Sequence, residues 1–304
     1  MKRTWPIAST AAALGLAVLG PLAAGCQRVA PPPSQFPNAA AALSRMKATY
    51  QCERGAKGEA KIDSFSEQGR IRGKVLLFAS RPSRLRFDLL SPPPFNSIIS
   101  TLTTDDGHFA LMDVRERKFY EGPASACNIA RLTEVPLEAH ALVSLLGGQA
   151  PLLVHRDSDL QIDWSTDGYY RVRIPSTRGA FEEVHLTPTP ADFQRPWSTQ
   201  RLRVLDVRVA QQDIELYHAS LDAHEWASTA PPQVDPDGID PPIPPSGPPC
   251  TVEVPRKIHI EVKESGQDVL FRYDDVKVNP PLPPGVFSQP LPSGAPRVHV
   301  DCDN

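Results

Sequence analysis

The sequence lacks the short motifs that most often mark a catalytic or nucleotide-binding site. None of G-x-S-x-G, H-E-x-x-H, a P-loop or a helix-opening G-x-G-x-x-G occurs in its 304 residues. It has no C-x-x-C pair, which excludes zinc ribbons and thioredoxin-like redox centres. The formal net charge is −3, so the chain lacks the excess of positive charge that is typical of nucleic-acid-binding proteins. We expect no catalytic residues, cofactor, metal or nucleic-acid partner, and an enzyme with dispersed residues ranks third among the possible functions.

The polar residues are scattered rather than gathered into sites. The eight histidines include His218 and His224, for which strand spacing provides no Asp or Glu partners, so we expect surface histidines. The segment 235–240 faintly resembles a calcium loop but lacks the distal glutamate, and it is interpreted as a solvated acidic linker. Five arginines could attract anionic lipid head groups, although such a cluster is more often a solvated strand face: Arg70, Arg72, Arg81, Arg84 and Arg86.

The N-terminal segment has the layout of a secretory signal. Lys2 and Arg3 precede the apolar run 7–22, which is too short and too weakly apolar for a confident membrane span. The run ends in Leu-Ala-Ala-Gly-Cys, and small residues before a cysteine resemble the lipobox of bacterial lipoproteins. Residues 1–25 are therefore predicted to be removed and Cys26 to carry the lipid, with a chance cysteine after an ordinary signal peptide as the alternative. Gln27 is not the aspartate that commonly retains such proteins at the inner membrane, so we expect the periplasmic face of the outer membrane.

The other four cysteines form an even set in an oxidising compartment, which predicts two disulfides. They are Cys52, Cys127, Cys250 and Cys302. Three pairings are possible and the sequence does not choose among them. We favour Cys52 with Cys127, which would tie the N-terminal helix to the later helices, and Cys250 with Cys302, which would tie the proline-rich tail to the sheet.

Proline is abundant, at 34 of 304 residues, or about 11% against a usual value of about 5%. Because proline ends helices and is excluded from central strands, these residues must lie in tails, turns and insertions. The segment 26–37 is predicted to be a tether, 230–249 a proline-rich insertion and 291–304 a C-terminal tail. This leaves 38–290 as one domain.

Strand patterns dominate that domain. Leu85, Phe87 and Leu89 alternate with polar residues, as expected of a strand that is apolar on one face. About ten to eleven antiparallel strands follow between residues 71 and 278, interrupted by helices near 127–132 and 137–146. A third helix, capped by Asn38, is expected before the strands. The fold class is therefore mainly β with about three helices.

Three segments carry a resemblance to a known family. Residues 85–148 run from a basic and apolar strand through Ser-Pro, an Asp-Gly strand pair and "LMDVRERKFYEG" to a helix that ends in Leu-Leu-Gly-Gly. This order is similar to the outer-membrane lipoprotein receptor LolB. The hairpin 77–87 and the closing segment 271–287 look like the periplasmic carrier LolA and its superfamily. The resemblance implies an open, curved antiparallel sheet, an incomplete β-barrel, with helices covering its concave face.

The resemblance also implies a function. Members of this superfamily hold lipoprotein acyl chains in an apolar cavity, and the receptors carry an apolar membrane loop, which here would fall at the short, basic segment 80–84. Strand alternation gives candidate cavity residues that could equally form a sealed core: Val75, Leu77, Leu85, Phe87, Leu89, Ile99, Leu111, Val172, Ile174, Leu202 and Val204. The predicted function is binding of lipid or lipoprotein acyl chains in outer-membrane lipoprotein localisation, with a periplasmic carrier protein as a further partner. The alternative is a structural or assembly lipoprotein of the same fold that binds nothing.

Overall fold

The computed structural model describes residues 28–66 and 69–302, so the signal segment and Cys26 lie outside the described residues. The described residues form one sheet of fourteen strands, in the order β14-β6-β5-β4-β3-β2-β1-β13-β12-β11-β10-β9-β8-β7. Its strands are β1 (Gly55–Ser66), β2 (Gly69–Ser80), β3 (Arg84–Leu90), β4 (Ile98–Asp105), β5 (His108–Asp113), β6 (Lys118–Pro123), β7 (Gln161–Ser165), β8 (Tyr169–Pro175), β9 (Ala180–Pro188), β10 (Leu202–Gln211), β11 (Ile214–Ser228), β12 (Thr251–Val262), β13 (Gln267–Val278) and β14 (Arg297–His299). The mainly β class predicted from the sequence is confirmed.

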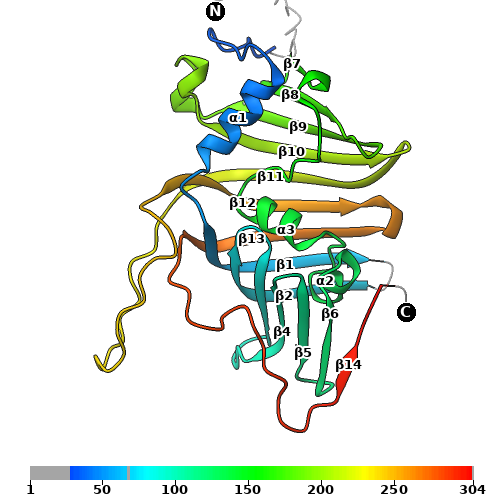
Figure 1. Ribbon diagram of the computed structural model, residues 1–304, viewed down its shortest axis with the longest axis vertical. Helices are drawn as coiled ribbons and strands as arrows, with labels where there is room; N and C mark the ends of the chain where they lie inside the picture. Colours follow the sequence, from blue (N-terminus) through cyan, green and yellow to red (C-terminus); the bar gives the residue numbers. More distant parts are fainter. Residues whose placement is uncertain (1–27, 67–68, 303–304) are drawn as a thin grey trace, which may run out of the picture.

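The sheet is open and strongly twisted. Neighbouring strands are antiparallel except β14, which runs parallel to β6, and within the described residues the end strands β7 and β14 do not pair with each other. The strands β4, β5 and β6 run nearly at right angles to β9, β10 and β11 (Figure 1). The predicted incomplete barrel is therefore present.

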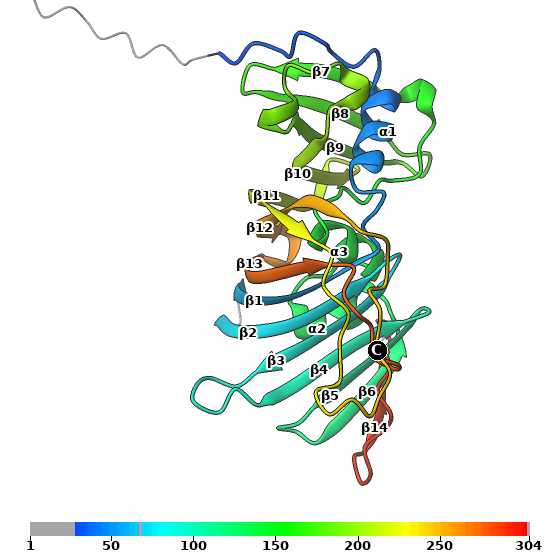
Figure 2. The ribbon, with the colours of Figure 1, turned by 90° about the vertical axis from the view of Figure 1, so that its left-hand side faces the viewer.

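The α-helices of the described residues lie on one face of this sheet (Figures 1 and 2). They are α1 (Ala39–Thr49), α2 (Ala126–Thr133) and α3 (Ala139–Leu146). Short 3-10 helices occur later in the chain, in the connections before or between strands: η1 (Asp157–Asp159), η2 (Pro190–Asp192), η3 (Trp197–Thr199) and η4 (Lys263–Ser265). Helix α1 begins at the predicted cap, because the Asn38 side chain accepts a hydrogen bond from the Ala41 amide at 2.8 Å. It packs on β10, whereas α2 packs on β4 and β5, and α3 on β2, β3 and β12.

The strand count exceeds the prediction because β1 and β14 have weak sequence signals. Strand β1 lies in the middle of the sheet between β2 and β13, yet its inward face is largely small, with Ala56, Gly58 and Ala60. The close packing explains this: a Cβ on Gly58 would stand 2.8 Å from the Asp275 carbonyl oxygen and 3.0 Å from the Tyr273 ring. A pattern search for large apolar residues at alternate positions does not find such a strand.

All four described cysteines form disulfides, as predicted, but the favoured pairing is wrong. Cys52 is bonded to Cys250, and Cys127 to Cys302. Long-range strand order decides this. Cys52 precedes β1 and Cys250 precedes β12, and only β13 separates these two strands in the sheet. Cys302 follows β14, which lies beside β6, and Cys127 lies in α2, which follows β6 in the chain. Helices α1 and α2 cover different parts of the sheet, so the predicted link between them cannot form.

The insertion and the tail are both fastened to the sheet. Residues 229–250 leave the sheet between β11 and β12 and form a long excursion (Figure 1). Buried Asn279 fixes the end of this excursion to the sheet. The Asn279 side chain accepts a hydrogen bond from the Arg54 amide at 2.7 Å and donates to the carbonyls of Cys52 and Pro248. Further along, the Gln289 amide donates to the Thr101 and Ala110 carbonyls, which places the tail on the outer face of β4 and β5.

Candidate functional site

The concave face of the sheet forms a packed apolar interior. Nine of the eleven predicted cavity residues are buried there, none more than 6% exposed: Val75, Leu77, Leu85, Phe87, Leu111, Val172, Ile174, Leu202 and Val204. Those on β2, β3 and β5 belong to the part that α2 and α3 cover, and those on β10 to the part that α1 covers. Leu89 packs on the margin of this core and is only partly buried. The predicted residues therefore share one core but not one pocket.

Ile99 does not belong to this interior. Leu102 pairs with both Phe87 and Leu111 and faces inward, whereas Ile99 lies at a bulge of β4 and does not pack against the core. Leu102 and Phe271 are fully buried inward residues that the sequence reasoning missed. The run of Ile98–Asp105 mixes Ser and Thr with aliphatic residues on both faces, and alternation alone could not choose the face.

Aliphatic side chains of the helices fill the space above the sheet. The largest buried side chains come from all three helices: Leu142, Leu145 and Leu146 of α3, Ile129 of α2, and Leu43 and Met46 of α1. The other buried helix residues are Ala39, Ala42, Asn128, Thr133, Ala139, Ala141 and Val143. The helices thus act as the cover of the interior, and any ligand of the concave face must take the place of some of these side chains.

Polar contacts hold the C-terminal end of α3. The Tyr273 hydroxyl donates to the Leu146 carbonyl at 3.2 Å. Just beyond the helix, Gln149 donates at 3.2 Å to the carboxylate of Glu53, which also pairs with Arg81. Burial raises the pKa of Glu53, and the Arg81 guanidinium opposes that rise. This network fixes the turn at 80–84 to the end of the helix.

One carboxyl group faces the apolar interior without a charged partner. Glu182 on β9 is 0% exposed, accepts a hydrogen bond from the Leu153 amide at 2.8 Å, and has no partner for its Oε1 atom among the described residues. Burial raises its pKa to about 8, so the group is largely a neutral acid at pH 7. Burial raises the pKa of nearby Tyr217, and the negative charge of Glu182 adds to this rise. The sequence carried a signal for it, since Glu182 shares a strand face with Val184 and Leu186.

The loop between β3 and β4, rather than the segment 80–84, exposes a large apolar side chain. The segment 80–84 is bound to Glu53 through Arg81, whereas Phe95, in the loop between β3 and β4, is 82% exposed. Beneath this loop, on the outer face, is a pocket of about 560 Å³ with an aliphatic floor and a basic rim. Its lining includes the apolar residues Leu90, Pro92, Pro93 and Leu270, the basic residues Lys61, Arg72, Lys74 and Arg272, and Asp63, which pairs with Arg72. Among the described residues, no helix combines the length and the apolar character that a membrane crossing needs.

Comparisons with known proteins find likeness in solved structures alone, because no family model and no curated protein matches the chain. A LolA superfamily protein from Nitrosomonas europaea has 13% identity and a TM-score of 0.47, over 84% of this chain and 99% of the other. A DUF1329 family protein from Desulfovibrio piger has 9% identity and a TM-score of 0.49, over 82% and 97%. A candidate outer membrane lipoprotein-sorting domain from Vibrio parahaemolyticus has 10% identity and a TM-score of 0.44, over 82% and 95%.

The chain is thus similar to a member of the LolA superfamily, as its sequence resemblance predicts, while the LolB side of that resemblance stays a prediction.

Proposed function

We propose that this protein is a lipid-anchored carrier at the periplasmic face of the outer membrane, which takes up acyl chains of a lipid or lipoprotein between its sheet and its helices. The observation that carries the proposal is the cover of the concave face. Large aliphatic and aromatic residues line the sheet there, and an eight-residue helix, α3, shields the part over β2 and β3. Two disulfides support an oxidising compartment.

Uptake needs no bond making, only exchange of one apolar surface for another. A sixteen-carbon chain gains on the order of 10 kcal/mol on burial before entropic costs. Moving α3 aside uncovers Leu142, Leu145 and Leu146, at about 1.5–3 kcal/mol for each leucine. The two quantities are similar in size, so the interior can open for cargo and close after its release. A reversible carrier requires such a balance.

Lipid analysis of the chain from residue 28 onward, exported without its anchor, tests the proposal. Solvent extraction followed by mass spectrometry should recover close to one equivalent of lipid, and an apolar fluorophore such as N-phenyl-1-naphthylamine should bind. Phe87→Ser should weaken dye binding, because Phe87 lies on the inward face of β3. Phe78→Ser is the matched control, because Phe78 faces outward on β2 and contacts Lys57.

A second function is favoured by the dense packing of the interior, whose predicted cavity residues are nearly all buried. In this case the protein is a structural or assembly lipoprotein with a permanently filled core. If no lipid co-purifies and the dye signal does not exceed that of buffer, the carrier proposal fails and the structural function replaces it. Equal dye binding by the Phe87 and Phe78 variants, both folded by circular dichroism, would place the dye outside the concave interior.

A further inference from the structure

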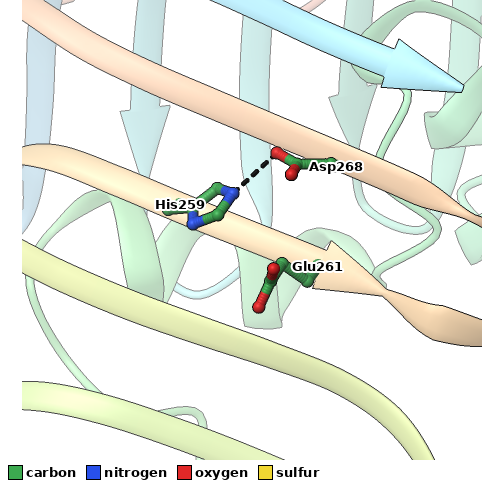
Figure 3. A group of neighbouring side chains, drawn as sticks. All are labelled: His259, Glu261 and Asp268. Carbon is green, nitrogen blue, oxygen red and sulfur yellow. Dashed lines mark hydrogen bonds and ion pairs between the residues drawn. The ribbon is translucent and has the colours of Figure 1, made fainter.

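Three potential metal ligands converge on the outer face of the sheet, away from the apolar interior. His259 and Glu261 are two positions apart on β12 and therefore project from the same face. Asp268 is the residue of β13 directly opposite Glu261. One ligand atom from each of the three lies within 4.8 Å of the others, and the His259 Nε2 atom is 2.6 Å from the Asp268 carboxylate (Figure 3). The convergence depends on the register between β12 and β13, which local sequence patterns do not reveal.

The charges around these residues are unbalanced. Two carboxylates face each other across β12 and β13, a pairing that destabilises a sheet unless a cation lies between them. Over residues 28–66 and 69–302, the ion pairs of Glu261 and Asp268 are formed with histidines and with no lysine or arginine. The site therefore has the charge to accept a cation.

A second histidine stands behind the site and orients it. His218 on β11 is opposite Glu261, with its Nδ1 atom 3.0 Å from the Glu261 carboxylate. Its Nε2 atom contacts the Asp206 carboxylate at 2.5 Å. The expectation that His218 has no acidic partners is therefore wrong, because both partners come from neighbouring strands. Outer residues that hold a ligating carboxylate in place are a usual part of metal sites.

We propose that His259, Glu261 and Asp268 bind a divalent first-row transition ion, of the Zn²⁺ type, with His218 and Asp206 supporting Glu261 from outside the coordination shell. One imidazole nitrogen and two carboxylates suit such an ion, whereas Ca²⁺ and Mg²⁺ favour oxygen ligands throughout. All three ligand side chains are partly exposed, so an ion reaches them from solvent and water completes the coordination. The ion would join β12 to β13 near their shared turn.

Calorimetric titration of the full chain with ZnCl₂, in detergent at pH 7.5, tests this proposal. We expect one saturable equivalent, weakened more than about tenfold in both His259→Ala and Asp268→Asn. The matched control is His140→Ala. His140 also pairs with a carboxylate, that of Glu138 at 3.2 Å, but lies on the exposed side of α3. The control variant should therefore bind Zn²⁺ as the wild type does. MgCl₂ should give no saturable heat.

The outcomes separate cleanly. A Zn²⁺ equivalent that is lost in both ligand variants and kept in the control, with an upward shift in Tm confined to wild type and control, supports the site. No saturable Zn²⁺ binding, unchanged binding in the two ligand variants, or Mg²⁺ binding of the same strength overturns it. Because these side chains lie on the outer face, the substitutions remove no core contact, and Asp268→Asn changes a single atom type. Lipid binding is measured separately, so this test does not depend on the carrier function.

Discussion

Replacement of Glu182 by glutamine should change how the stability of the protein depends on pH. The wild-type carboxyl group faces the apolar interior, with the Leu153 amide as its hydrogen-bond donor. Burial raises its pKa from 4.5 to about 8. In the unfolded chain the same group is in water and ionises near its ordinary pKa. Glutamine has nearly the same shape, keeps an oxygen for the Leu153 amide, and never ionises.

The size and sign of the effect follow from proton linkage. Between about pH 4.5 and pH 8 the folded chain holds a proton on Glu182 that the unfolded chain has released. The free energy of unfolding therefore falls as pH rises, by about 1.4 kcal/mol per pH unit from this group. The contribution is fully present below pH 4.5, and about 5 kcal/mol of it is lost by pH 8. The glutamine variant should match the wild type near pH 4.5 and exceed its stability by roughly 4 kcal/mol near pH 7.5.

Urea unfolding at half-unit steps from pH 5 to pH 8, with disulfides intact, measures this difference. The difference in free energy between variant and wild type should grow steadily across the series. Glu183→Gln is the control for loss of a neighbouring carboxylate, because Glu183 lies on the opposite face of β9, where it pairs with Arg173 and His185. A constant difference between Glu182→Gln and wild type across the range would refute a buried neutral acid at this position.

Three further predictions follow from other parts of the chain. Cys26→Ser should release the protein from membranes or leave it uncleaved, as fractionation and mass measurement will show; a processed variant that still sediments with membranes would remove the case for the lipid. Cys302→Ser should lower stability by about 2–5 kcal/mol in urea unfolding and leave one free thiol at Cys127. Phe95→Ser in a Cys26→Ser background should reduce sedimentation with vesicles, because it removes the most exposed aromatic ring of the β3–β4 loop; equal sedimentation of the two chains would show that the loop does not touch lipid.

Local pattern predicted much of the fold. Alternation in Leu85, Phe87 and Leu89 indicated a strand with one apolar face, and β3 forms there. Asn38 indicated the start of α1, and its side chain caps the helix. Elements with distinct local chemistry were therefore found from sequence alone.

Features that depend on strand order were not predictable in this way. The disulfide partners, the acidic neighbours of His218 and the convergence of His259 with Asp268 all require knowledge of which strands lie side by side. Strand β1 was missed for another reason, because its inward positions are small where the ring of Tyr273 lies against them. Whether the apolar interior opens to cargo depends on the relative free energies of two states, and one sequence pattern is compatible with both.

The parallel strand β14 covers the edge of the sheet that β6 would otherwise leave free. Without it, β6 would present a free edge with unpaired amide and carbonyl groups, to which another chain could add a strand. Three residues, Arg297–His299, occupy that edge, and the disulfide from Cys302 to Cys127 secures them. Because the two cysteines are 175 residues apart, β6 stays without this partner until the segment around Cys302 has been synthesised. Forms of the protein that lack this short strand should therefore depend most on chaperones while they fold.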